Sequence, residues 1–368
     1  MAHLRFGETA WLERQVAHYC TGCDGYFLAG ATVRDLPPRV AGLVPTAVNA
    51  RLWHVSPTFL NIEPTTRCNF SCWYCVGRHM KQEDIRVEDF ARALDNFPNL
   101  KHVALVGEGE PLLHKQFFTM ARMARERGIE VLMISNGSAF SQSVVKQMCE
   151  TGISYVAISI DSTDPETFAK SRIDGDLNKI WEGVERLRTY RDDHGYRYPR
   201  IAVKGTLFDY SRDQMLPIVE AAFRHGVEMV EGFQPINPKT SYVGWYPRAH
   251  VGQLQYADEV AACITRDLER VQARFPGIAD YCREHGMDFN SNGWPNRIRP
   301  NCDEPWLYSL LSGDVTPCCQ IKQVMSPRWN LFRHPVTDIL QDPAYEIMRF
   351  NLWNGFFKDY CSGCHRTR

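Results

Sequence analysis

The sequence predicts an α/β protein: a partial (β/α)6 barrel, about three quarters of a TIM-like barrel, followed by a small cysteine-rich C-terminal domain. Two observations lead to this fold class. Short apolar, β-branched runs alternate with amphipathic stretches of helical length, which is typical of repeated βα units around a parallel sheet. Near the C-terminus this rhythm stops and paired cysteines follow.

Six strands and four of the helices between them can be placed from this rhythm. The helical stretches end at Gly128, Gly152 and Gly226, where a glycine permits the left-handed turn that closes a helix. Because the strands are parallel, their carboxyl ends share one face of the barrel, where sites gather. The expected strands are 58–63, 102–106, 130–135, 155–161, 201–207 and 227–233, and the expected helices are 117–127, 141–150, 178–191 and 214–225.

Composition limits the classes of partner. The 368 residues include 42 basic and 43 acidic side chains, so no net charge favours a nucleic acid. The N-terminus lacks the apolar run of a signal peptide, and no stretch approaches transmembrane length. We therefore expect a cytoplasmic protein that binds no membrane. Its 13 cysteines indicate metal or cluster ligands rather than disulfides.

Three cysteines follow the first predicted strand: Cys68, Cys72 and Cys75. Three thiolates at this spacing can hold three corners of a four-iron, four-sulfur cluster and leave one iron open. The alternative is a zinc site completed by His79, although structural zinc usually takes four ligands in two knuckles. The position of the triple, directly after a strand, favours the cluster.

A glycine–acid turn follows the second predicted strand. Gly109 lets the backbone approach a ligand closely, Glu110 can accept hydrogen bonds from an ammonium group, and Pro111 fixes the exit from the turn. Alone, such a turn is often an ordinary strand-to-helix loop. Here it lies on the same face of the barrel as the cysteines.

The cysteine triple, with aromatic Tyr74 before its last member, resembles the C-x3-C-x-aromatic-C motif of radical SAM enzymes. Gly109-Glu110-Pro111 resembles their G-G-E-P turn, except that Glu108 stands between the two glycines. The resemblance implies an open-iron [4Fe-4S] cluster that binds S-adenosylmethionine by its amino and carboxylate groups. One electron then yields a 5′-deoxyadenosyl radical, which removes a hydrogen atom from the substrate.

Further cofactor contacts are expected at the ends of later strands. Ser135 and Asn136 resemble the family's T-N-G turn that lines the cofactor, and Arg172 resembles its arginine that reaches the carboxylate of S-adenosylmethionine. Alternation on the fourth strand turns Ser159 and Asp161 inward, toward a ribose or a carboxylate.

Two alternatives and one more contact complete this set. Asp161 could instead cap the next helix, although Asp164 before Pro165 is the better cap. Gln234, just after the sixth strand, could contact the adenine.

The candidate catalytic residues are Lys204, Glu63 and Cys319. Lys204 on the fifth strand and Glu63 on the first point inward by alternation. A lysine at this position can be a proton acceptor or a substrate anchor, or it can simply extend its amine to solvent from the rim. Cys319 is a surplus thiol that could donate hydrogen or replace the neighbouring Cys318 as a ligand.

The C-terminal region supplies four more cysteines, Cys302, Cys318, Cys361 and Cys364. The pattern C-x10-G-x4-C followed by C-x2-C resembles the SPASM/twitch extension, here in its shorter twitch form, which implies one auxiliary [4Fe-4S] cluster. Zinc is the alternative. The similar knuckle Cys20/Cys23 is either part of an additional metal centre or a pair of free thiols.

We expect an N-terminal extension over 1–55, the radical SAM barrel over 56–235, a linker with a helical insertion over 236–300 and the auxiliary domain over 301–368. The expected function is net two-electron oxidation of a small polar metabolite such as a sugar, aminocyclitol or nucleoside, with flavodoxin or ferredoxin as electron donor. The alternatives are a redox-neutral epimerase or decarboxylase, a peptide or protein maturase, and a non-catalytic zinc-binding protein.

Overall fold

The structure is a computed structural model. It describes residues 57–75, 77, 80–208, 210–235, 273–289, 307–316, 324, 326–342 and 345. The N-terminal extension expected over 1–55 lies outside these residues, and so does most of the linker with its helical insertion expected over 236–300.

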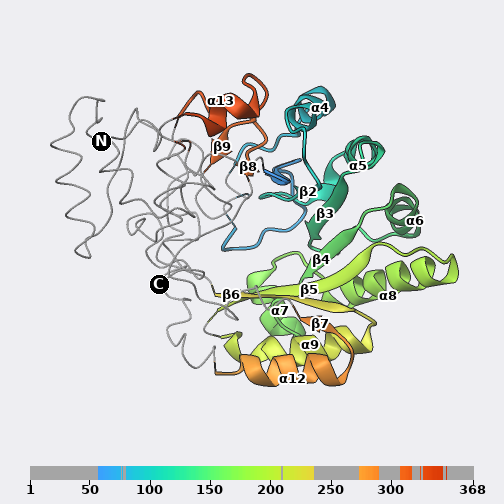
Figure 1. The fold of residues 1–368 in the computed structure, drawn as a ribbon. Helices are drawn as coiled ribbons and strands as arrows, with labels where there is room; N and C mark the ends of the chain where they lie inside the picture. Colours follow the sequence, from blue (N-terminus) through green and yellow to red (C-terminus); the bar gives the residue numbers. More distant parts are fainter. Residues whose placement is uncertain are drawn as a thin grey trace, which may run out of the picture.

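One parallel sheet organises the described chain, and six of its strands follow one another in sequence order. Figure 1 shows them fanned into a curved sheet that stays open. The six predicted strands are confirmed, each with its ends within two residues of expectation. They are β1 (Phe59–Ile62), β2 (His102–Leu105), β3 (Glu130–Ser135), β4 (Tyr155–Ser159), β5 (Arg200–Leu207) and β6 (Met229–Pro235).

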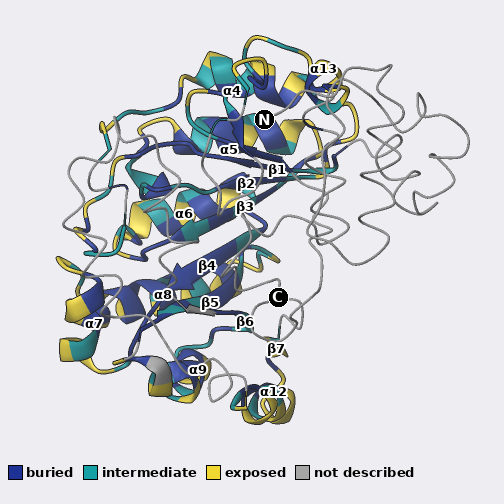
Figure 2. Ribbon diagram, turned by 90° about the vertical axis from the view of Figure 1, so that its left-hand side faces the viewer, coloured by how far each residue is buried: buried dark blue, intermediate teal, exposed yellow. Residues whose placement is uncertain are grey.

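Helices cover the outer side of this sheet (Figure 1), and they turn their buried residues toward it (Figure 2). The four predicted helices are confirmed, α7 begins after the cap that the sequence had favoured, and the structure adds α4, which the sequence rhythm had not revealed. The helices over this part of the chain are α4 (Val87–Asp95), α5 (Phe117–Glu126), α6 (Gln142–Thr151), α7 (Pro165–Ser171), α8 (Leu177–Asp193) and α9 (Met215–Arg224).

Local sequence sets the helix ends. The side chains of Ser141 and Asp164 accept hydrogen bonds from the first turns of α6 and α7, as N-cap residues do. Asp164 is thus the cap that the sequence favoured. Gly152 ends α6 with a φ of 74°, a left-handed conformation that glycine adopts without a steric penalty.

The side chains of β4 alternate between an apolar face and a polar face of the strand. Val156, Ile158 and the following Ile160 are fully buried, and they lie on the side of the strand opposite to Ser159 and Asp161. The apolar residues pack in the core beneath the helices. The inner face of the sheet is therefore left for polar side chains.

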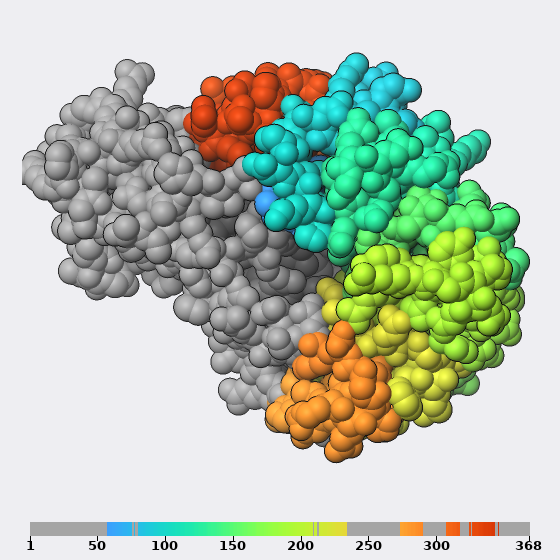
Figure 3. All heavy atoms as spheres, turned by 45° about the vertical axis from the view of Figure 1, so that its right-hand side comes forward, coloured from blue at the N-terminus to red at the C-terminus, as the bar shows by residue number. Residues whose placement is uncertain are grey.

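The described C-terminal residues extend the same sheet. Strand β8 (Leu307–Ser309) pairs in parallel with β1, and β9 (Val315–Thr316) pairs antiparallel with β8. The segment that follows, which includes α13 (Val336–Leu340), lies against the segment of α4 (Figure 3). The Asn96 amide after α4 donates to the carbonyl of Leu331 at 2.6 Å.

The sequence had predicted no strand beyond β6. β8 satisfies the hydrogen-bonding groups that an open β1 edge would otherwise expose. At the other edge, β7 (Asp288–Phe289) and α12 (Phe275–Glu284) continue the βα pattern past β6. Among the described residues, none of the helices has the length and apolar character needed to cross a membrane.

The two faces of β4 lead to a stability prediction. Ile158→Ala should lower the free energy of unfolding by about 2–5 kcal/mol, because it leaves a cavity in the core. Ile173 is 39% exposed, so Ile173→Ala should change it by less than about 0.5 kcal/mol. Urea unfolding measures both. Equal small losses would contradict the assignment of Ile158 to the core.

Candidate functional site

The cysteine loop, residues 63–77, leaves the carboxyl end of β1 and is anchored at several points along its backbone. The amide of Glu63 donates to Ser309 O at 3.0 Å, and that of Ser71 donates to Ile173 O at 3.0 Å. Phe70 is 5% exposed and lies in the core cluster. The loop is thus tied to β8, to the residues after α7 and to the core.

The glycine–acid turn packs against the cysteine loop backbone to backbone. The amide of Glu110 donates to Arg67 O at 2.7 Å. A Cβ atom on Gly109 would lie 2.4 Å from Thr65 O, and one on Gly77 would lie 2.3 Å from Glu108 O. Both contacts are closer than any side chain tolerates, so glycine is required at each position.

The three thiols lie in this clamped loop and differ in their surroundings. The amide of Phe70 donates to Cys68 Sγ at 3.4 Å, and the Asn136 amide is 3.9 Å from the same sulfur. The Cys75 thiol donates to Glu108 at 3.7 Å from the carbonyl oxygen and 3.8 Å from Oε2. The residue that departs from the family turn therefore contacts the third cysteine.

Burial governs the ionisation of these thiols. It raises the pKa of Cys72 to about 11. It also raises the pKa of Cys75, together with the charge of Glu108, and that of Cys68. In the metal-free chain the thiols are therefore protonated at neutral pH, and metal binding must displace their protons.

The donor set fits an iron–sulfur cluster better than a single metal ion. In the parts of the chain that the structure describes, no three His, Cys, Asp or Glu side chains converge closely enough for one ion. The body of a four-iron cluster separates its thiolates, and amide groups near the sulfurs tune such clusters. Cys68, Cys72 and Cys75 would hold three irons, with the amides of Phe70 and Asn136 beside the first sulfur.

Glu110 joins the glycine–acid turn to the end of β3. Its carboxylate accepts hydrogen bonds from Ser135 Oγ at 2.9 Å, from the Asn136 amide at 2.7 Å and from the Leu112 amide at 3.3 Å. The side chain is 2% exposed, and burial raises its pKa to about 7. A carboxylate has about four acceptor positions, so one remains for a ligand.

A second buried network joins the end of β4 to the cysteine loop. Asp161 is fully buried. It forms an ion pair with Arg172 at 2.9 Å and accepts a hydrogen bond from the Tyr74 hydroxyl at 3.2 Å. Burial acts to lower the pKa of Arg172, but the charges of Asp161, Tyr74 and Cys72 and the hydrogen bond to Asp161 together outweigh it, and the net shift is upward. Asp161 makes no contact that caps α7.

Two of the candidate catalytic residues, Glu63 and Lys204, belong to the described part of the chain. Glu63 is fully buried and accepts a hydrogen bond from the Tyr308 hydroxyl at 2.8 Å. Lys204 is half-buried on β5, opposite Ser159 of β4. Their catalytic roles stay predictions. The structure shows that the strand carrying Tyr308 reaches the same face as Glu63.

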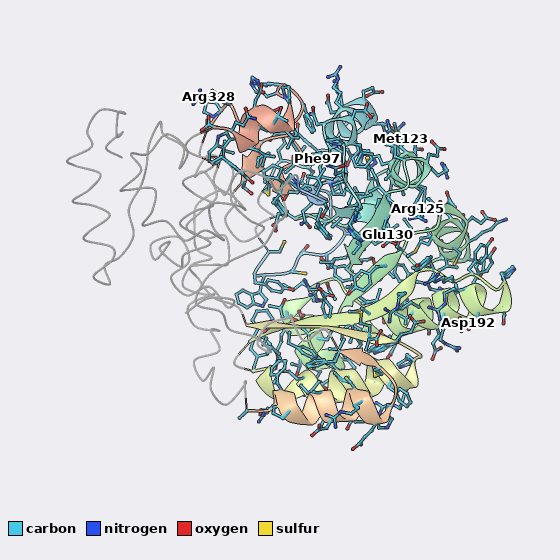
Figure 4. All side chains as sticks on the ribbon, viewed as in Figure 1. Phe97, Met123, Arg125, Glu130, Asp192 and Arg328 are labelled. Carbon is cyan, nitrogen blue, oxygen red and sulfur yellow. The ribbon has the colours of Figure 1, made fainter. Side chains whose placement is uncertain are left out.

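Glu130 and Asp192, labelled in Figure 4, mark the end of the sheet opposite to the cysteine loop. Neither is a predicted site residue.

The side chains of several residues that the sequence analysis singled out are not described. Gln234 belongs to β6, but its side chain is not described. The candidate metal ligands and surplus thiols that lie outside the described part are Cys20, Cys23, His79, Cys302, Cys318, Cys319, Cys361 and Cys364.

Sequence reasoning missed three residues that complete the site. Glu108 contacts Cys75, Tyr308 contacts Glu63, and the amide of Thr206 donates to Asp161 at 2.8 Å. Glu108 could have been found as the departure from the family turn. Tyr308 and Thr206 act through pairing between distant segments, which a single sequence does not show.

Residues 62–199 match the model of the Radical SAM superfamily. This range runs from the end of β1 to the residue before β5 and contains the cysteine triple, the glycine–acid turn, Asp161 and Arg172. This part of the chain is a radical SAM domain.

The curated relatives match over part of their length. A tungsten-containing aldehyde ferredoxin oxidoreductase cofactor-modifying protein of Pyrococcus furiosus is 27% identical over 190 residues, 49% of this chain and 53% of the relative. A GTP 3′,8-cyclase of Rhizobium leguminosarum bv. trifolii is 29% identical over 182 residues, 47% of this chain and 50% of the relative. The chain thus spans about half the length of these two relatives.

Solved structures share the fold. SuiB of Streptococcus suis has been solved bound to precursor peptide SuiA and bound to S-adenosylmethionine. These two structures align with TM-scores of 0.60 and 0.62, at 14% identity, over 93% of this chain and 79% of SuiB. At this identity the likeness shows the open parallel α/β architecture and nothing beyond it.

The close packing at Gly109 predicts a loss of cluster binding on substitution. Gly109→Ala should displace the cysteine loop at a cost of about 1–3 kcal/mol, and iron per chain after anaerobic reconstitution should fall. Gly277 in α12 has open space around it, so Gly277→Ala should keep the iron and stabilise the chain by about 0.5–1 kcal/mol. Full iron loading of Gly109→Ala would contradict the clamp.

The raised pKa of Glu110 predicts that the stability of the metal-free chain depends on pH. Its pKa rises from 4.5 to about 7 on folding, so its contribution to stability is complete below about pH 4.5 and is lost as pH rises through about 7. Between pH 4.5 and 7.5, unfolding free energy of the wild type should fall relative to Glu110→Gln by on the order of 3 kcal/mol. A constant difference would refute this shift. Glu88→Gln, at an exposed position, is the control.

Proposed function

We propose that this chain, whose residues 62–199 form a radical SAM domain, is an enzyme that cleaves S-adenosylmethionine and removes a hydrogen atom from a small polar metabolite. The observation that carries the proposal is the loop with three free thiols that the glycine–acid turn clamps. The side chains near this loop at the carboxyl ends of β2 to β5 are polar.

The residues of the chain have separate roles in this proposal. Cys68, Cys72 and Cys75 hold a [4Fe-4S] cluster, and when bound this cluster supplies the electron that cleaves the cofactor. The open acceptor position of Glu110 faces the ammonium group of S-adenosylmethionine, and Arg172 supplies positive charge for the carboxylate. Ser135 and Asn136 orient Glu110 through the hydrogen bonds at 2.9 and 2.7 Å.

A small polar substrate is supported by two kinds of observation. The inner face presents Ser159 on β4 and Lys204 and Thr206 on β5, and the buried Glu63 follows β1. These groups suit hydroxyl or phosphate groups better than apolar ones. The relatives at 27% and 29% identity are a cofactor-modifying protein and a GTP cyclase. A nucleoside or nucleotide is therefore the substrate type we favour within the metabolite class.

We further propose a net two-electron oxidation, in which Cys302, Cys318, Cys361 and Cys364 hold an auxiliary cluster that accepts the second electron. Glu63 or Lys204 would take the proton that the substrate releases. A flavodoxin or ferredoxin would supply the first electron. Four thiolates leave no iron open for S-adenosylmethionine, so electron transfer and structure are the roles that such a cluster can serve.

The test is the replacement of Cys68, Cys72 and Cys75 by alanine. The triple variant should lose about four irons per chain and form no 5′-deoxyadenosine from S-adenosylmethionine under dithionite. Iron and sulfide analysis and chromatography of the products measure both effects. Cys149 is a buried thiol of α6, and Cys149→Ala should keep both properties. Continued formation of 5′-deoxyadenosine by the triple variant would overturn the proposal.

A further inference from the structure

The Asp161 carboxylate is fully buried and lies against four donor atoms of the protein. Oδ1 accepts from the Thr206 amide at 2.8 Å and from Arg172 Nη2 at 3.0 Å. Oδ2 accepts a hydrogen bond from the Tyr74 hydroxyl at 3.2 Å and lies 2.9 Å from Arg172 Nε, an ion-pair contact without hydrogen-bond geometry. A carboxylate offers about four acceptor positions. Three positions accept hydrogen bonds and the Arg172 guanidinium lies against the fourth, so no open side is left for the hydroxyl groups of a ribose.

Arg172 is held side-on by this carboxylate and keeps donors in reserve. The carboxylate lies against Nε and Nη2, so the Nη1 side of the guanidinium is directed away from Asp161. The Arg172 side chain is 10% exposed. Because a guanidinium is planar, two contacts on one edge fix the direction of its remaining N–H groups.

The same carboxylate ties together the segments that border the cofactor site. Arg172 ends α7, Thr206 belongs to β5, and Tyr74 lies between the second and third cysteines. The Arg172 guanidinium also lies 5.9 Å from the centre of the Tyr74 ring. Loss of Asp161 would therefore release the orientation of both Arg172 and Tyr74.

We propose that Asp161 is a positioning residue: it orients Arg172 for the carboxylate of S-adenosylmethionine and makes no contact with the ribose. This assignment rests on the proposed function. It differs from the expectation that an inward-facing Asp161 binds the ligand directly. A ligand contact would require Asp161 to give up a buried partner, and a buried charge without its partner is costly.

Two ligands that share adenine and ribose separate these roles. S-adenosylmethionine carries the carboxylate, whereas 5′-methylthioadenosine lacks the entire amino-acid end. In Asp161→Asn an amide nitrogen takes the place of one oxygen and opposes an N–H group of Arg172 or Thr206, so the network is misaligned while the volume is kept. Calorimetry on the anaerobically reconstituted protein measures both affinities.

The expected result is selective. Asp161→Asn should weaken the binding of S-adenosylmethionine at least about 10-fold and the binding of 5′-methylthioadenosine less than about 2-fold. Asp161→Asn/Arg172→Lys should bind S-adenosylmethionine no more weakly than Arg172→Lys alone, because residues that act through one another are not additive. Asp164→Asn, the same change at an exposed cap, should alter neither affinity.

If Asp161→Asn weakens the binding of both ligands equally, the positioning role is overturned and a ribose contact is indicated. A further 10-fold loss in the double variant relative to Arg172→Lys would also overturn it. If the unaltered protein binds neither about four irons at the triple nor S-adenosylmethionine, the proposed function fails, and the assignment of Asp161 falls with it.

A second variant covers the case in which Asp161→Asn does not fold. Asp161→Asn/Arg172→Met removes both charges, a change that buried pairs often tolerate. It should bind 5′-methylthioadenosine within about 2-fold of the wild type and S-adenosylmethionine at least about 10-fold more weakly. Loss of 5′-methylthioadenosine binding in this folded variant would contradict the proposal.

Discussion

The candidate site depends on the direct contact between two backbones, that of the glycine–acid turn and that of the cysteine loop. The Glu110 amide donates to Arg67 O, and at Gly109 and Gly77 the opposing carbonyl oxygens leave no space for a side chain. This contact fixes the cysteine loop before any metal arrives. A preorganised loop loses less conformational entropy on binding a cluster than a free one.

The parallel sheet explains why separate motifs meet at this contact. Loops that follow β1 to β5 emerge at the same end of the sheet, and the buried carboxylates of two of them are held by neighbouring segments. Glu110 is held by the end of β3, and Asp161 by β5 and α7. Buried carboxylates of this kind are costly unless fully hydrogen-bonded, so the two networks also fix the loops relative to one another.

The fold was predictable from sequence where periodicity and glycine stops are strong, as in the run from β3 through α6 to β4. Helix α4 escaped because it is only nine residues long, and β8 because its parallel neighbour β1 is far away in the chain. At the site, the spacing of Cys68, Cys72 and Cys75 was sufficient to indicate their chemistry. The four contacts of Asp161 were not predictable, since alternation shows which way a side chain points but not what it meets.

The central claim is that the loop holds a four-iron cluster with one iron left open for S-adenosylmethionine. Mössbauer spectroscopy of protein reconstituted with ⁵⁷Fe tests it most directly, in a variant that lacks Cys361 and Cys364 so that only one cluster forms. The account predicts that S-adenosylmethionine changes the isomer shift of one iron in four and leaves the other three unchanged. Four equivalent irons that do not respond to S-adenosylmethionine would contradict it.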